Sequence, residues 1–157
     1  MKTIIVACNR LEDELEFAMK KTPVSYPVIW VEGELHNTPS KLTARLSEVL
    51  DQVDAQRVLM LFGFCGNAVL GIRAKNFEMI IPRVDDCISL LFGSVKKRAA
   101  ISAEYAAFFI TEGWLHVKGN IWEEYLTSVE TYGEEVAHYI MNAQFGHYRT
   151  LGVPDVG

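Results

Sequence analysis

Short apolar segments of strand length alternate along this chain with segments of helical periodicity. The apolar segments are residues 3–7, 28–31, 57–62, 77–81 and 105–110. Between them, apolar side chains recur every three to four residues, as on the buried face of a helix. Strands that are joined through helices in this way form parallel pairs. The pattern therefore predicts an α/β fold, with a single domain over residues 1–157 built as a three-layer sandwich around a mostly parallel, Rossmann-like sheet of about five strands.

Local signals refine the helix predictions. Thr38 is placed to cap a helix that has Pro39 at its first position and Leu42 at the start of its apolar stripe. The last helical pattern covers residues 121–144 and is interrupted by Gly133. Glycine weakens a helix interior, so the sequence predicts either one long helix or two short ones at this end of the chain.

Four of the apolar segments stop at, or within a few residues of, a side chain that can bind a metal or act as a nucleophile. These side chains are Cys8, His36, Cys65 and the triplet Asp85, Asp86 and Cys87. The carboxyl ends of parallel strands lie at one edge of a sheet, and ligands bind in the crevice at that edge. We therefore expect the three cysteines to surround one pocket.

Thiolates and imidazole suit zinc or another borderline-soft transition metal. The predicted metal ligands are His36, Cys65, Cys87 and Cys8. Their spacing is long and matches no zinc finger or ribbon, so the assignment depends on the fold. Free cysteine is also one of the most buried residue types, and Cys8, which directly follows a strand core, is equally well explained as packing.

The remaining candidate residues surround these ligands. Asp85 and Asp86 are predicted catalytic residues that orient His36 or act as a base, although both can also simply cap the helix that follows. The predicted cofactor-binding residues are Gly66 and Asn67 in a tight turn, Arg83, and Trp114 as a pocket wall. Arg83 has a second interpretation, an ion pair with one of the aspartates. Trp114 has the alternative of packing in the core.

Composition excludes several classes of partner. The chain has 15 Lys and Arg against 20 Asp and Glu, with no basic stripe of the kind that binds nucleic acid. No apolar segment is long enough to span a membrane, and the one at residues 4–8 is too short for a secretory signal. An odd number of cysteines, three, does not indicate a disulfide framework. We expect a cytoplasmic protein with no nucleic-acid or membrane partner.

Several short motifs, taken together and in order, resemble the family known as domain of unknown function 1638. They are IVAC at 5–8, LHNTPSKL at 35–42, GFCGN at 63–67, IPRVDDCI at 81–88, GS at 93–94 and TEGW at 111–114. The resemblance implies a setting in one-carbon metabolism, because such genes often lie beside those for corrinoid-dependent methyl transfer in anaerobic bacteria and methanogenic archaea. It also implies a site at Cys8, His36, Cys65, Asp86 and Cys87. Family members usually continue with another strand and helix, which we expect this chain to lack, since it finishes at Leu151–Gly157.

Three functional hypotheses follow. The leading one is a metal-binding protein, most simply a zinc protein, associated with methyl transfer, where a small molecule or a corrinoid protein is the partner and any corrinoid is the partner's cofactor. The second is a metal-free enzyme in which Cys65 or Cys87 is the nucleophile, His36 its base and the glycine-rich turn an oxyanion site. The third is a non-catalytic module that forms a homo-oligomer through its aromatic C-terminal helix.

Overall fold

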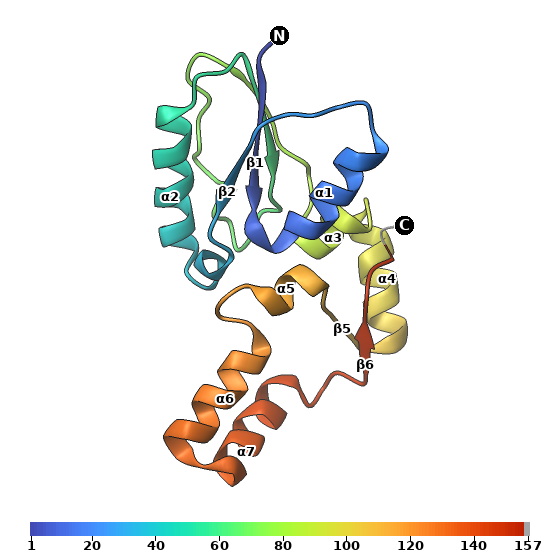
Figure 1. The fold of residues 1–157 in the computed structure, drawn as a ribbon. Helices are drawn as coiled ribbons and strands as arrows, with labels where there is room; N and C mark the ends of the chain where they lie inside the picture. Colours follow the sequence, from blue (N-terminus) through green and yellow to red (C-terminus); the bar gives the residue numbers. More distant parts are fainter. Residues whose placement is uncertain (156–157) are drawn as a thin grey trace.

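The computed structural model describes residues 1–155 and has the predicted α/β fold. Its central sheet has four parallel strands in the order β2-β1-β3-β4. The strands are β1 (Thr3–Cys8), β2 (Val28–Val31), β3 (Arg57–Leu61) and β4 (Glu78–Ile80). Because all four run in the same sense, their carboxyl ends lie at one edge, the lower edge in Figure 1.

Helices cover both faces of this sheet, as expected for a three-layer sandwich. On one face, Val6 and Met60 pack against Leu46 of α2 (Pro39–Gln52) in a buried cluster. On the other face, Ile5 and Ala7 pack with Leu15 of α1 (Glu12–Lys21). Neighbouring residues of β1 thus point to opposite faces, which is the alternation that a strand imposes and the reason that its whole sequence is apolar.

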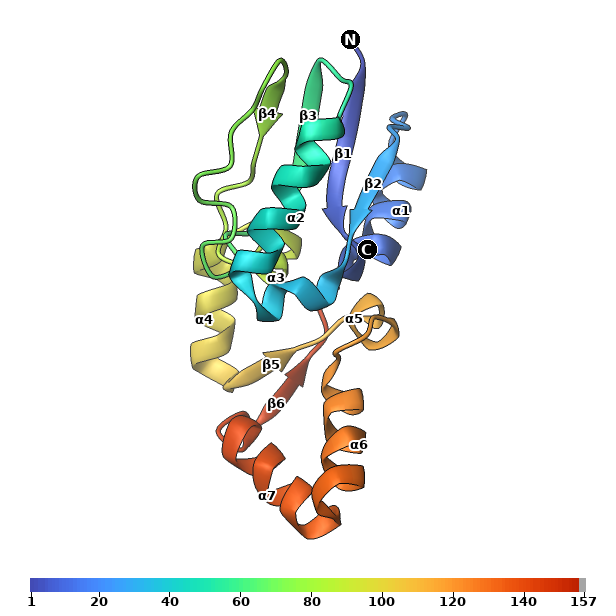
Figure 2. The same ribbon diagram turned by 90° about the vertical axis from the view of Figure 1, so that its left-hand side faces the viewer.

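The predicted fifth strand does not join the central sheet. Residues Ala107–Phe109 form β5, which pairs in parallel with β6 (Thr150–Gly152) in a separate two-stranded sheet. Helix α4 (Val95–Tyr105), which we did not predict, carries the chain away from β4 before β5 begins (Figure 2). The sheet therefore has four strands rather than five. The short strand β6 follows the helical C-terminal region, and residues 156–157 lie outside the described part of the chain.

The remaining elements are short helices and a projecting helical hairpin. The short ones are the 3₁₀ helices η1 (Asn9–Leu11) and η2 (Gly33–Asn37), with α3 (Cys87–Leu91) and α5 (Glu112–His116). The C-terminal helical pattern forms two helices, α6 (Ile121–Tyr132) and α7 (Glu134–Phe145), which separate at Gly133 with φ +84°. They pack against each other and extend away from the sheet (Figures 1 and 2). Within residues 1–155, no helix has the length and apolar character needed to cross a membrane.

Candidate functional site

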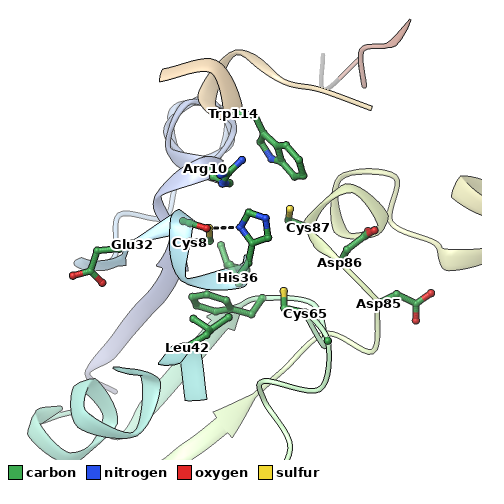
Figure 3. A pocket seen from close by; sticks show the side chains of 14 residues that line it. Cys8, Arg10, Glu32, His36, Leu42, Cys65, Asp85, Asp86, Cys87 and Trp114 are labelled. Carbon is green, nitrogen blue, oxygen red and sulfur yellow. Dashed lines mark hydrogen bonds between the residues drawn. The ribbon is translucent and has the colours of Figure 1, made fainter. Parts of the chain in front are cut away.

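A pocket of about 330 Å³ opens at the carboxyl edge of the central sheet (Figure 3). This volume lies at the lower end of the range for small-molecule sites. Its lining includes these predicted site residues: Cys8, His36, Cys65, Gly66, Asp85, Asp86, Cys87 and Trp114. Asn67 and Arg83 are exposed and do not line it. The topology thus brings together the three cysteines and the histidine, which come from four separate segments of the chain.

Cys8 is both a core residue and a pocket residue. It ends β1, is 8% exposed, and belongs to the cluster beneath α2. Its sulfur also lines the pocket and accepts a hydrogen bond from the backbone N–H of Arg10. Cys8 therefore packs in the core, as one interpretation held, and also lies where the other interpretation, a metal ligand, requires it.

Cys65 and Cys87 are brought together by a backbone contact between the segments that carry them. The N–H of Phe64 donates to the carbonyl of Val84 at 2.8 Å, and the N–H of Cys65 to that of Asp85 at 2.9 Å. A β-carbon on Gly63 would lie 2.5 Å from the backbone of Asp86, so only glycine permits this approach. The two segments cannot separate or exchange register without losing these contacts.

The turn that carries Cys65 has an unusual backbone. Cys65, Gly66 and Asn67 have φ values of +45°, +65° and +71°, three consecutive left-handed residues. The left-handed region costs a residue with a β-carbon about 1–2 kcal/mol. Such strain persists only where the surroundings hold it, and it is concentrated at functional sites. Here the hydrogen bond to Asp85 holds Cys65 at the pocket.

His36 is held in one orientation by its own 3₁₀ helix. Its Nδ1–H donates to the carbonyl oxygen of Gly33, which leaves Nε2 as the free acceptor. Burial lowers the pKa of His36, against the hydrogen bond to Gly33, which raises it. In Figure 3 the imidazole and the sulfurs of Cys65 and Cys87 point into the same space. Our expectation that an aspartate orients His36 is wrong, because the backbone carbonyl does so.

The two aspartates are mainly structural in this geometry. Asp86 caps α3 by accepting from the N–H of Ser89 at 2.7 Å, and its other oxygen lies 3.4 Å from Nη2 of Arg98. The ion pair that the sequence suggested for Arg83 is thus made by Arg98 instead. The reason is that α4 brings Arg98 beside the cap, whereas Arg83 points into solvent. Asp85 is exposed and supplies its backbone carbonyl to Cys65.

The thiols are protonated at neutral pH unless a cation enters the pocket. Burial raises the pKa of Cys8, raises that of Cys65 to about 11, and raises that of Cys87 still further. Mutual proximity adds to this, since a thiolate at Cys8 or Cys65 would repel one at Cys87. The backbone N–H of Gly63, which donates to the sulfur of Cys65, acts in the opposite direction. A free thiolate nucleophile is therefore disfavoured.

Arg10 is a pocket residue that the sequence analysis missed. It is 2% exposed, lines the pocket, and lies with its guanidinium carbon 4.8 Å from the ring centroid of Trp114. Trp114 forms a wall of the pocket and also packs against the buried cluster that contains Ile88 and Phe109, so both of its interpretations hold. The position of Arg10 in the sequence could have identified it, because Arg10 lies two residues beyond the end of a strand. The other predicted site residues also follow strand ends.

The donor atoms share one pocket but are not positioned to coordinate a single metal ion. In the described part of the chain, no group of three or more Cys, His, Asp or Glu side chains stands in position to hold one metal ion. The three cysteines are free thiols. The site therefore offers soft donors in one pocket, and the side chains must move to share an ion.

Comparisons with known proteins identify the family. No curated protein and no solved structure matches this chain. One family, described as "Protein of unknown function (DUF1638)", matches residues 30–157, which is most of the chain and includes every motif of the resemblance after the first strand. The chain therefore belongs to the DUF1638 family.

Proposed function

We propose that this pocket binds a transition metal ion, most simply zinc, through Cys65, Cys87 and His36, with Cys8 as a fourth ligand or as a neighbour of a site whose fourth position is open to substrate. The observation that carries the proposal is the convergence of three thiols and one imidazole at the carboxyl edge of the sheet. Zinc takes three or four such ligands in proteins. Cysteines that served only as core residues would not be expected to surround a cavity together with a histidine.

The surroundings of these donors support the proposal. With Nδ1–H donating to Gly33 and the pKa of His36 lowered, Nε2 is left as an acceptor that no described residue uses, which is the state in which imidazole binds a metal. Backbone N–H groups donate to the sulfurs of Cys8 and Cys65, and such bonds stabilise thiolates at metal centres. The raised thiol pKa values are consistent with a site that exchanges its protons for a cation.

Metal binding requires side chains to rotate but does not require the backbone to move. The backbones of Cys65 and Cys87 are fixed by the contact at Gly63, so their sulfurs can approach an ion only by changing χ1. Rotamer changes at partly exposed residues are fast and cost little compared with a metal–thiolate bond. Both residues are partly exposed at the pocket.

The proposal includes a setting in corrinoid-dependent or other one-carbon methyl transfer, which rests on the family resemblance. It also includes a location in the cytoplasm, which rests on the sequence pattern. Zinc in such a site would lower the pKa of the thiol of a small-molecule substrate, so that the substrate binds as a thiolate. Trp114 and Arg10 would enclose that substrate, and His36 and the cysteines would fix its reacting end. A corrinoid, where involved, would be the cofactor of a partner protein.

Metal content tests the proposal. We expect reduced protein, purified without chelators and analysed by inductively coupled plasma mass spectrometry, to hold about one zinc per chain. C65S and C87S should each weaken binding at least tenfold, because each removes a ligand. H138Q is the matched control. His138 is exposed on the hairpin, so its loss should leave the zinc content and zinc affinity unchanged. Substoichiometric metal that is unaffected by C65S and C87S would contradict the proposal.

A second candidate function, a homo-oligomeric binding module, is favoured by the surface of the α6–α7 hairpin. Large apolar side chains are exposed on it, among them Trp122, Leu126, Tyr132 and Tyr139. Trp122 also lines a shallow apolar depression with Tyr125 and Met141. Aromatic residues of this kind are typical of interfaces, so a second copy of the chain is the proposed occupant. This candidate is compatible with a metal site in the pocket.

A further inference from the structure

Arg10 has hydrogen-bond donors from which no group within the described residues 1–155 accepts. A guanidinium has five N–H donors, and Arg10 uses only those of Nη2, which donates to the carbonyls of Lys118 at 3.5 Å and Gly119 at 3.3 Å. Its Nε is buried and has no hydrogen-bond partner in the part of the chain that the structure describes. Nη1 makes no hydrogen bond within residues 1–155. Buried polar groups are normally satisfied, so these unused donors require an explanation.

Trp114 has the same deficit at the same end of the pocket. Its indole Nε1 is buried and has no hydrogen-bond partner among the described residues, although the ring lies against the guanidinium of Arg10. Figure 3 shows the two side chains next to each other above His36. Both unsatisfied groups are donors only. A ligand that satisfied them would have to supply acceptors, and an anionic oxygen is the strongest acceptor for such a pair.

Within residues 1–155, no ion pair compensates the charge of Arg10. No carboxylate lies within ion-pair distance of it in the part of the chain that is described, and Glu34 acts on it only from farther away. Other titratable groups that face it are the thiols of Cys8 and Cys87, which are neutral when protonated, and the imidazole of His36, which supplies no negative charge. An uncompensated cation that is 2% exposed is costly, and a bound anion would offset that cost.

We propose that the pocket binds a small organic anion whose carboxylate, sulfonate or phosphate group is held by Arg10 and Trp114. The remainder of the molecule then extends along the pocket toward Cys65 and Cys87. This deepens the proposed function by naming the charge of its ligand. It does not require a metal to be bound, so the two proposals can fail separately.

The test compares two alkylating reagents of nearly equal size, the anion iodoacetate and the neutral iodoacetamide. Rates at Cys65 are measured by mass spectrometry on the reduced, chelator-treated full chain at about pH 9, and their ratio is divided by the ratio for the unfolded chain. We expect iodoacetate to be favoured about fivefold, the effect of one charge–charge interaction in a partly solvated pocket. Sulfate added at constant ionic strength should reduce this preference.

Variants distinguish binding of the anion by Arg10 from attraction by the overall electrostatic potential of the protein. R10Q should abolish the preference, R10K should retain part of it, and R83Q should leave it unchanged because Arg83 is exposed outside the pocket. If R10Q does not fold, sulfate competition in the wild-type chain decides instead. A ratio equal to that of the unfolded chain, a preference that survives R10Q, or a preference that sulfate does not reduce would overturn the inference. Each result stands whether or not the chain binds zinc.

Discussion

Individual residues at the pocket serve the fold and the site together. Cys8 fills the core and faces the cavity, and Gly63 has no side chain so that Cys65 can lie beside the start of α3. Gly33 accepts the hydrogen bond that orients His36, and its missing β-carbon leaves room for Arg10. Substitutions at these positions are therefore expected to change stability and ligand binding together.

G63A should be the most damaging small substitution near the site. The added carbon would overlap backbone atoms of Asp86, which cannot move without breaking the hydrogen bonds between the two segments. We expect a loss of about 3 kcal/mol, the upper end of the range for overpacking, together with loss of metal binding. Urea denaturation and metal titration provide the measurements.

The matched control for G63A is G71A, because a β-carbon added to Gly71 would meet nothing within 4 Å, although the residue has φ +83°. This variant should lose about 1 kcal/mol through backbone strain and keep its metal affinity. Equal effects of the two substitutions would show that the approach of Cys65 to Cys87 does not depend on Gly63.

The raised pKa of Cys65 predicts how the stability of the metal-free protein depends on pH. The pKa of this thiol is about 11 in the folded chain against an ordinary value of 9.0, so the folded state binds the proton more tightly. Its contribution is fully present below about pH 9 and is lost as pH rises toward about 11. Under reducing conditions, the wild type should lose stability over this interval faster than C65S. Parallel stability curves would contradict the assigned burial of the thiol.

Elements were predictable where periodicity and end signals agreed. The four strands of the central sheet and helix α2 were expected at nearly their observed bounds, since each is an apolar segment or stripe with a turn or Pro39 beside it. Helix α4 was missed because its only strong signal is the cap at Ser94, a residue that fits the end of the preceding helix equally well. The pairing of β5 with β6 depends on a tertiary contact that no local pattern reveals.

The α6–α7 hairpin should mediate self-association. Trp122 is 58% exposed and belongs to the apolar surface proposed as the interface. W122E would place a charge there and should raise the dissociation constant of a dimer at least tenfold, as loss of an aromatic hot spot does. Sedimentation velocity over a concentration series measures this. L70E is the control, because Leu70 is 62% exposed on a different part of the surface. A monomer at every concentration, or equal effects of both variants, would contradict this role.

At the scale of the whole molecule, the location of the site was predictable but its detailed arrangement was not. Parallel strands bring their carboxyl ends to one edge, so strand ends that carry Cys8, Cys65 and Cys87 had to lie near one another. Sequence alone could not show that Arg10 is buried, that Gly33 orients His36, or that Arg98 replaces Arg83 beside Asp86. Two of these features depend on tertiary packing, because α5 packs against η1, which carries Arg10, and α4 packs against α3, which Asp86 caps. The third is a contact within η2 that no sequence pattern marks.

In the proposed site, thiols and an imidazole from separate segments bind one ion. X-ray absorption at the zinc edge, on protein loaded with one equivalent of zinc, identifies the atoms around that ion. We expect two or three sulfur neighbours at about 2.3 Å and one nitrogen neighbour at about 2.0–2.1 Å, with one sulfur fewer in C65S. A shell made only of nitrogen and oxygen, or a sulfur count that C65S leaves unchanged, would contradict the account.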